Sequence, residues 1–138
     1  MRNKDLLFMI DLYDYSSLYS IITLKAKDME WLLEDGNYLK KVISVEEIVA
    51  VIQNVMEEKC EFIILSPSTP IKSCNYMQAA PAGANNMHIE VSILQPTGKS
   101  RTFSRVCTPD VAVSFFTLFY IEDVVPDVKD WTFEGEFD

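Results

Sequence analysis

The sequence predicts an α+β domain in which an antiparallel β-sheet of four to six strands packs against two main helices. Two observations lead to this fold class. Capping signals mark the starts of two helices, at about 44–58 and 108–121, and short segments rich in β-forming residues lie between them. The 138 residues contain no repeat, low-complexity tract or Gly/Ser-rich linker, so we expect a single α+β domain over residues 1–138.

The first predicted helix begins after Ser44, which forms a capping box with Glu47. In this motif the serine side chain accepts from the third backbone N–H, and the glutamate side chain accepts from the backbone N–H of the cap. Ile43 and Ile48 have the spacing of a hydrophobic staple around the cap. The helix should end near Glu58. Its apolar stripe consists of Ile48, Val51, Ile52 and Val55.

The second predicted helix begins at the segment TPDV. Thr108 takes the cap position, and Pro109 takes the first helical position, where its missing N–H costs nothing. The residues that follow, VAVSFFTLFYI, are apolar on nearly every side. Such a helix either lies at the centre of the fold or is shared with another chain. We favour the central position, and a homodimer formed through Phe115, Phe116 and Phe119 stays as an alternative.

Between the helices lie four segments with strand character, at 61–66, 73–80, 87–94 and 100–107, which predict an antiparallel meander of three or four strands. The segments SPSTP, PAGANN and QPTG separate them and have the composition of loops and turns. Earlier in the chain, LLFMIDLY and YSIITLKA have the composition of two further strands. The segment KDMEWLLEDG is compatible with a short helix or a third strand.

A candidate binding face follows from the alternation of side chains along these strands. Met87 and Ile89 alternate with His88 and Glu90, so the apolar pair should face the core and the polar pair should face away from it. The same alternation places the polar residues of 73–80 on the outer side. His88, the only histidine of the chain, therefore belongs to an outward row.

The next strand adds to this row if QPTG closes as a four-residue loop. That register sets Glu90 opposite Phe103 and His88 opposite Arg105, with an arginine diagonally on either side of the glutamate. The predicted binding face consists of Tyr76, Gln78, His88, Glu90, Arg101, Phe103 and Arg105.

Three interpretations of this face stay open. It is a solvated sheet surface whose charges pair across strands, or a protein-binding surface, because aromatic, arginine and amide groups are typical of interfaces. The third interpretation is a small-molecule or catalytic pocket near Cys74 and His88, since a cysteine and a histidine can form a nucleophilic pair. No motif surrounds the cysteine and no oxyanion hole is indicated, so we do not expect an enzyme.

Charge is the strongest compositional signal. Twelve basic residues against twenty-one acidic ones give a formal net charge of −9. This balance repels a phosphate backbone and attracts a cationic protein, so we expect no nucleic-acid partner. The C-terminal segment 122–138 carries seven acids and only Lys129, interleaved with apolar residues. It is either a tail that lies on the body of the protein or an acidic patch for a basic partner.

Three isolated cysteines indicate a reducing compartment and argue against a disulfide framework or a zinc knuckle. The apolar run from Leu6 to Ile10 stops at Asp11, which is too short for a signal peptide, and no stretch approaches a membrane span. We therefore expect a cytoplasmic protein with no membrane association. Ligand spacing for zinc, an acidic calcium loop and a glycine-rich phosphate loop are all missing, so we expect no metal and no cofactor.

From Phe62 to Trp131 the order is an apolar strand, NYMQA, HIEV, RTF, a capped helix with FFTLFY, and DW. This order resembles small single-domain bacterial proteins related to the immunity proteins of polymorphic toxins. The resemblance covers about half the chain and implies a non-enzymatic protein that blocks a cognate toxin by binding it. PAGANN and the first 40 residues do not fit the pattern. The residues that carry the match are Tyr76, Gln78, Glu90, Phe103, Phe119, Tyr120, Asp130 and Trp131.

Overall fold

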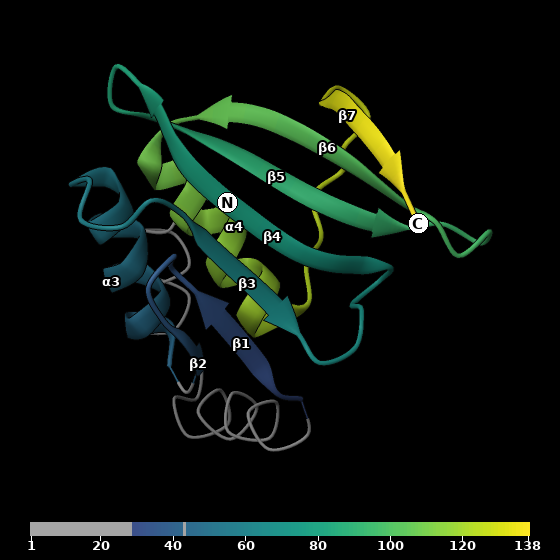
Figure 1. Cartoon of the computed structure of the whole chain (residues 1–138), viewed down its shortest axis with the longest axis horizontal. Helices are drawn as coiled ribbons and strands as arrows, with labels where there is room; N and C mark the ends of the chain where they lie inside the picture. The colour runs from purple at the N-terminus through teal and green to yellow at the C-terminus, as the bar shows by residue number, and fades with distance from the viewer. Residues whose placement is uncertain (1–28, 43) are drawn as a thin grey trace, which may run out of the picture.

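The computed structural model describes residues 29–42 and 44–138, and in this part of the chain seven strands form one antiparallel sheet (Figure 1). The strand order is β2-β1-β3-β4-β5-β6-β7. The α+β class is confirmed, whereas the predicted count of four to six strands is too low. The strands are β1 (Trp31–Glu34), β2 (Leu39–Lys41), β3 (Ile63–Pro67), β4 (Cys74–Gly83), β5 (Asn86–Leu94), β6 (Ser100–Cys107) and β7 (Thr132–Phe137), and the helices are α3 (Val45–Met56) and α4 (Pro109–Glu122).

Helix α3 starts where its capping signal predicts. The Ser44 hydroxyl accepts a hydrogen bond from the Glu47 backbone N–H at 3.4 Å. All four residues of the predicted apolar stripe are buried. The helix ends at Met56, two residues earlier than predicted, and Glu58 then takes a left-handed conformation with φ of 60°. The proposed staple residue Ile43 lies outside the described residues.

Helix α4 lies at the centre of the core, as its apolar sequence predicts. Thr108 occupies the cap position, but its side chain makes no capping hydrogen bond. The Trp31 ring of β1 meets the Phe119 and Tyr120 rings edge-on, with centroids 5.1 and 5.3 Å apart. Phe116 and Phe119 are completely buried, so the three phenylalanines named for a homodimer do not form a common exposed surface.

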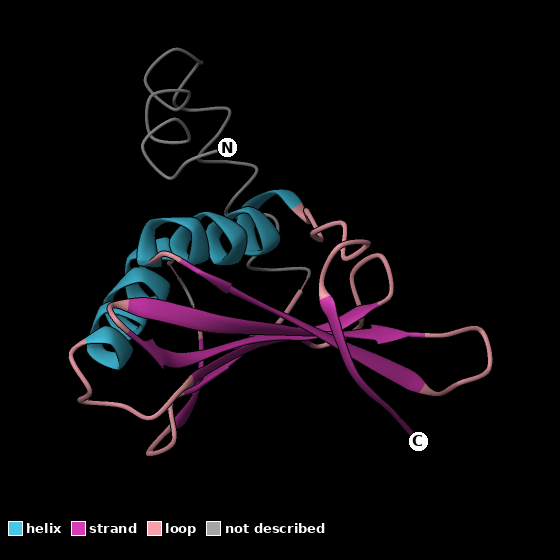
Figure 2. Ribbon diagram, turned by 90° about the horizontal axis from the view of Figure 1, so that it is seen from above, coloured by secondary structure: helices cyan, strands magenta, loops and turns pink. Residues whose placement is uncertain are grey.

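Both helices pack on the same face of the sheet (Figure 2). Helix α3 contacts β3, β4 and α4, and α4 also contacts β5. The core between them is formed by alternate residues of each strand, for example Leu65, Met77 and Ile89, which have no exposed surface. No described helix covers the opposite face of the sheet. In the part of the chain that the structure describes, the sheet therefore has one packed face and one open face.

Two tight turns set the registers of the central strands. Ala84 and Asn85 have φ of 50° and 61° and form a two-residue turn between β4 and β5. Positive φ at both central residues is the mark of a type I′ turn, which matches the twist of the strands it joins. The predicted loop PAGANN does contain the turn, but six residues are too many, because β4 extends to Gly83 and β5 begins at Asn86.

The turn between β5 and β6 is one residue shorter than predicted. The Gln95 N–H donates to the Lys99 carbonyl at 2.7 Å, and the Gly98 N–H donates to the Gln95 carbonyl at 2.9 Å. These bonds close a three-residue loop over 96–98, in which Gly98 has φ of 87°. Because side chains alternate along a strand, this one-residue difference turns every side chain of β6 to the other face.

The ends of the described chain add the strands β2 and β7, which the sequence did not predict, and decide between the two alternatives for KDMEWLLEDG. Within KDMEWLLEDG, the residues of β1 form a strand, so the helical alternative is wrong. The segments LLFMIDLY and YSIITLKA lie outside the described residues. Strands β2 and β7 form the two edges of the sheet. The residues of β7 belong to the segment 122–138, which was predicted to be a tail or an acidic patch. Val125, Val128 and Trp131 of that segment do pack against the core.

A polar sheet face as the candidate functional site

The register between β5 and β6 divides the predicted binding face in two. Glu90 lies opposite Ser104, and Val91 lies opposite Phe103, so the predicted pairing is wrong by one residue because the loop 96–98 holds three residues rather than four. Tyr76, Gln78, His88 and Glu90 share the open face, whereas Arg101, Phe103 and Arg105 point to the helix side of the sheet.

Two small hydroxyl residues of β6 take the place of the arginines on the open face. Thr102 lies opposite Ser92 and Ser104 opposite Glu90. Thr102, Ser104 and Ser92 are each only 4% exposed, although no described helix covers them. These short side chains lie lower than the longer side chains around them. Tyr76, which lies opposite Ser92, is partly buried. Sequence reasoning missed Thr102 and Ser104 because the assumed register turned them toward the core.

A β-bulge in β4 decides the orientation of Cys74. Cys74 lies opposite Ile93 and Tyr76 lies opposite Ser92, so Asn75 is an extra residue on this strand. The bulge turns Cys74 into the core, where it has no exposed surface and where burial raises the pKa of its thiol to about 12. The predicted proximity of Cys74 to His88 is therefore wrong, because the two side chains lie on opposite faces of the sheet.

Hydrogen bonds connect the centre of the open face. The Tyr76 hydroxyl donates to the Glu90 carboxylate at 3.4 Å. The Asn75 side-chain amide donates to the hydroxyl oxygens of Ser92 at 3.1 Å and Ser100 at 3.0 Å, which links β4 to β5 and β6. Burial raises the pKa of Tyr76, and the negative charge of Glu90 raises it further. Tyr76 is therefore a neutral O–H donor at physiological pH.

The open face of the central strands is poor in charge. The outward side chains of β4, β5 and β6 include one carboxylate, Glu90, and no lysine or arginine. Charged residues make up 24% of the whole chain, so this face differs from the rest of the sequence. We define the polar face as Asn75, Tyr76, Gln78, His88, Glu90, Ser92, Ser100, Thr102 and Ser104.

On the helix side of β6, aromatic rings hold the two arginines. The Arg105 guanidinium lies over the Phe115 ring at 5.7 Å, and Phe115 meets Trp131 edge-on at 5.6 Å. Further along the strand, the Arg101 guanidinium lies 6.0 Å from the centre of the Phe133 ring. These contacts join β6 to α4 and to the C-terminal segment. Arg101 and Arg105, which were predicted for the binding face, therefore pack against aromatic rings on the helix side of the sheet.

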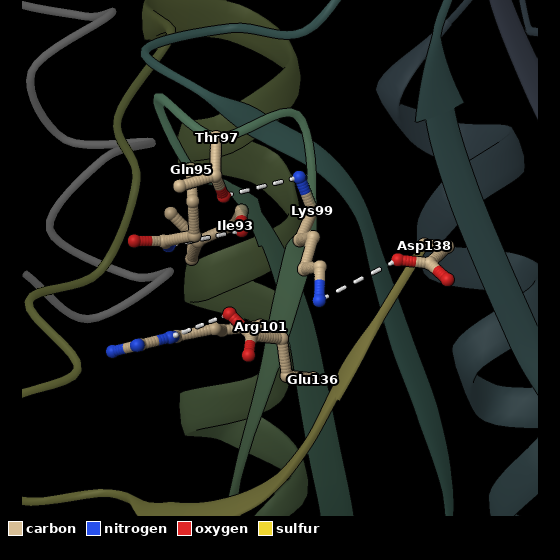
Figure 3. A network of polar contacts seen from close by, with 7 residues as sticks. All are labelled: Ile93, Gln95, Thr97, Lys99, Arg101, Glu136 and Asp138. Carbon is tan, nitrogen blue, oxygen red and sulfur yellow. Dashed lines mark hydrogen bonds and ion pairs between the residues drawn. The ribbon is translucent and has the colours of Figure 1, made fainter.

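Arg101 also forms an ion pair across the edge of the sheet (Figure 3). Its Nε lies 3.4 Å from a carboxylate oxygen of Glu136 on β7. The Lys99 ammonium lies 3.9 Å from the Asp138 carboxylate, beyond the end of the same strand. Both pairs are solvent-exposed, so each contributes at most about 1 kcal/mol to stability. In both pairs, a cation of β6 or of the turn before it lies close to an acid at the C-terminal end of the chain.

Residues 29–42 and 44–138 hold neither a metal-ligand cluster nor a membrane-spanning helix. No group of three or more His, Cys, Asp and Glu side chains in these ranges could hold a metal ion. Among the helices found there, none has the length and apolar character needed to cross a membrane.

Comparison with known proteins gives no family for this chain. No protein-family model, no curated protein and no solved structure matches the sequence or the fold. The geometry of the polar face is therefore the main basis for a function.

Proposed function

We propose that this protein is a non-enzymatic binding domain that holds a cationic protein partner on its polar face. The observation that carries the proposal is an open sheet face, three strands wide, with Glu90 as its only carboxylate and with no lysine or arginine. The resemblance to immunity proteins of polymorphic toxins supports a more specific role, in which the partner is a bacterial toxin.

The composition of the polar face supports binding to protein. Interface centres are depleted of charged residues, and tyrosine, serine and asparagine are the residues that antibody combining sites use most. Tyrosine offers a large contact area at low conformational cost, because it has only two rotatable side-chain bonds. Tyr76, with Asn75 and Ser92 beside it, gives the polar face this combination.

The polar face is also held in place before any partner arrives. Asn75 bonds to hydroxyl groups on two other strands, and Ser104 and Thr102 are buried between their neighbours. A surface whose side chains are already fixed loses less entropy on binding, so more of the contact energy appears as affinity. A solvated surface of long charged side chains would lack this property.

Glu90 supplies the charge specificity. A lysine or arginine of the partner would pair with a carboxylate that Tyr76 already orients through a hydrogen bond of 3.4 Å. Water is excluded when the surrounding hydroxyl groups are covered, which strengthens such a pair. The net charge of −9 adds long-range attraction for a cationic protein and speeds the encounter.

The test begins with the gene neighbourhood and proceeds to binding. If a neighbouring gene encodes a toxin domain, that domain is purified in an inactivated form, and its binding to the protein is measured by calorimetry. Glu90→Lys should weaken binding at least tenfold, because reversal of a central charge leaves the partner's cation unpaired. The absence of a toxin gene, or no binding by the wild-type protein, would overturn the toxin-neutralising role.

Glu34→Lys is the matched control, because it reverses the same charge on the same side of the sheet. Glu34 belongs to β1 and lies outside the polar face. It should weaken binding less than threefold. Both variants should keep the free energy of unfolding within about 1 kcal/mol of the wild type, because Glu34 is exposed and Glu90 is partly exposed on the open face. Equal losses for the two variants would show that only the total charge matters, and the polar face would not be the site.

A further inference from the structure

We infer that the outer edge of β7 is a second binding site, which takes an extended basic segment of another protein as an additional strand of the sheet. The outer edge of β7 contains none of the residues that define the polar face, so the inference stands without the proposed function. The mode is edge pairing, in which backbone hydrogen bonds give affinity and alternate side chains give specificity.

The outer edge of β7 has the backbone groups that such pairing needs. Strand β7 is six residues long and ends the sheet, so within residues 29–42 and 44–138 its strand neighbour is β6 alone (Figure 1). In an antiparallel pair, every second residue directs its N–H and C=O away from the partner strand. Within the described chain, no backbone hydrogen bond outside the β6–β7 ladder is recorded for residues 132–137. These groups are open to a further strand.

The opposite edge of the sheet shows how an edge is normally protected. Strand β2 has three residues, two of which are lysines. Lys40 pairs with Glu47 at 3.4 Å, and Lys41 pairs with Glu30 at 3.0 Å. A short edge strand with lysines discourages pairing with other chains. Strand β7 is twice as long and carries no lysine, so it lacks this protection.

Strand β7 also exposes apolar surface that an added strand would cover. Phe133 is 55% exposed and Phe137 is 58% exposed. Phe133 lies opposite Phe103 on the helix side, and Phe137 lies opposite Ser100 on the open side. An added strand would therefore find one aromatic ring on each of its faces. Two exposed phenylalanines within five residues are an unusual feature for an unpaired edge.

The negative charge of residues 122–138 favours a basic strand as the binding partner of β7. Residues 122–138 carry seven acids and one lysine, a formal charge of −6 out of the −9 of the chain. Glu136 and Asp138 have partners in Arg101 and Lys99, but Glu134 lies at the bulge of β7 and pairs with no cation in the described part of the chain. A strand with lysine or arginine at alternate positions would neutralise this edge.

The same charges exclude the simplest self-association. If two copies paired β7 with β7 in antiparallel fashion, Glu134 and Glu136 would approach the same acids of the second copy, which is destabilising. The β2 edge of a second copy is a poor occupant as well, because Lys40 and Lys41 already have carboxylate partners and the strand has only three residues. The occupant is therefore a basic strand from a different protein.

The test uses the full-length protein and a synthetic ten-residue peptide that alternates lysine and threonine. A second peptide has the same sequence but is N-methylated at its four central residues, so it keeps the charge and loses the backbone donors. Binding is followed by NMR shifts and amide hydrogen exchange. The first peptide should slow the exchange of amides within 132–137, and the methylated peptide should bind at least tenfold more weakly, about 1.4 kcal/mol.

Two charge variants complete the experiment. Glu134→Lys should weaken binding of the first peptide at least tenfold, whereas Glu61→Lys, at an exposed site in the α3–β3 connection, should change it less than threefold. Equal binding of the two peptides, or protection that does not map to β7, would overturn the inference. A dimer of the wild-type protein that Glu134→Lys dissolves would assign the edge to a second copy and also overturn it. Glu90→Lys should leave the peptide affinity unchanged, so failure of this test and failure of the polar face are separate results.

Discussion

Asn75 determines the orientation of two neighbouring side chains. Because it is an extra residue in β4, Tyr76 lies on the open face while Cys74 lies in the core. Without the bulge, strict alternation would put both side chains on one side of the sheet. A single unpaired residue therefore separates the centre of the polar face from a buried thiol.

Cys74 should behave as a structural residue. In the native protein at pH 8 we expect it to resist alkylation by iodoacetamide, because it has no exposed surface and its pKa is about 12. Cys60 is partly exposed and should react first. Mass spectrometry of peptides after a timed reaction measures both rates. Alkylation of Cys74 at the rate of Cys60 would contradict the buried position.

The same thiol should weaken the protein at alkaline pH. The folded-state pKa of Cys74 is about 12 against an ordinary 9.0, so the native state holds its proton more tightly than the unfolded state does. Its contribution to stability is complete below pH 9 and is lost as the pH rises toward 12, by at most about 1.4 kcal/mol per pH unit. Denaturation of the wild type and Cys74→Ala should therefore show a stability difference that shrinks between pH 9 and 10.5.

For single residues, the sequence predicted part of the polar face. The alternation around Met87 and Ile89 correctly placed Tyr76, Gln78 and His88 on the side away from the core. Orientation within one strand is readable because the apolar row identifies the buried side. The bulge at Asn75 was not readable, because the hydrogen bonds of Asn75 go to serines on two other strands that the local sequence of β4 does not reveal.

Among the elements, the two hairpin turns decide which residues share a face. The segment QPTG has proline at the second position of a type I turn and glycine at the fourth, which is the sequence signal of a three-residue loop with a left-handed glycine. Its interpretation as a four-residue loop placed Arg101 and Arg105 on the open face, where the structure has Thr102 and Ser104. The signal for the correct register was present in the turn itself.

The turn between β4 and β5 contains an alanine in an unfavourable conformation. Ala84 has φ of 50°, a left-handed value that costs a residue with a Cβ about 1–2 kcal/mol. Ala84→Gly should therefore raise the free energy of unfolding by up to about 1 kcal/mol after the loss of chain entropy is included. Urea denaturation measures the change.

Ala82→Gly is the control for that turn, because Ala82 is equally exposed and has no positive φ. This change should lower the stability, since glycine only adds flexibility to the unfolded chain. A similar stabilisation by both changes would show that conformational strain at Ala84 is not the cause.

The helices and the central strands were predictable, but the edge strands were not. Helix α3 and helix α4 carry local capping signals, so each starts at its predicted residue. Strand β2 is exposed along its whole length, and β7 has only one partly buried residue, so neither has an apolar row that reveals a strand. Their pairing depends on backbone hydrogen bonds to a neighbour, and side-chain patterns do not report these bonds.

For the whole molecule, the net charge of −9 opposes the compact state. The ion pairs Lys41–Glu30, Lys99–Asp138 and Arg101–Glu136 are exposed and weak, so repulsion among the acids should dominate the response to salt. We expect the melting temperature to rise by several degrees between 20 mM and 500 mM NaCl, because the screening length falls several-fold over this range. Calorimetry at constant pH measures the shift. A fall in melting temperature would mean that attractive pairs outweigh the repulsion.

The strand order carries a consequence for the path of folding. From β3 to β6 adjacent strands are consecutive in sequence and are joined by short connections, whereas β7 reaches β6 only across α4 and β1 reaches β3 only across β2 and α3. Local pairings form quickly, and pairings that close a long stretch of chain come late and are released early. The meander from β3 to β6 is therefore the part from which assembly should start. The seam between β1 and β3 is where a partly opened molecule would first separate, and Trp31 is the residue that would report it by fluorescence.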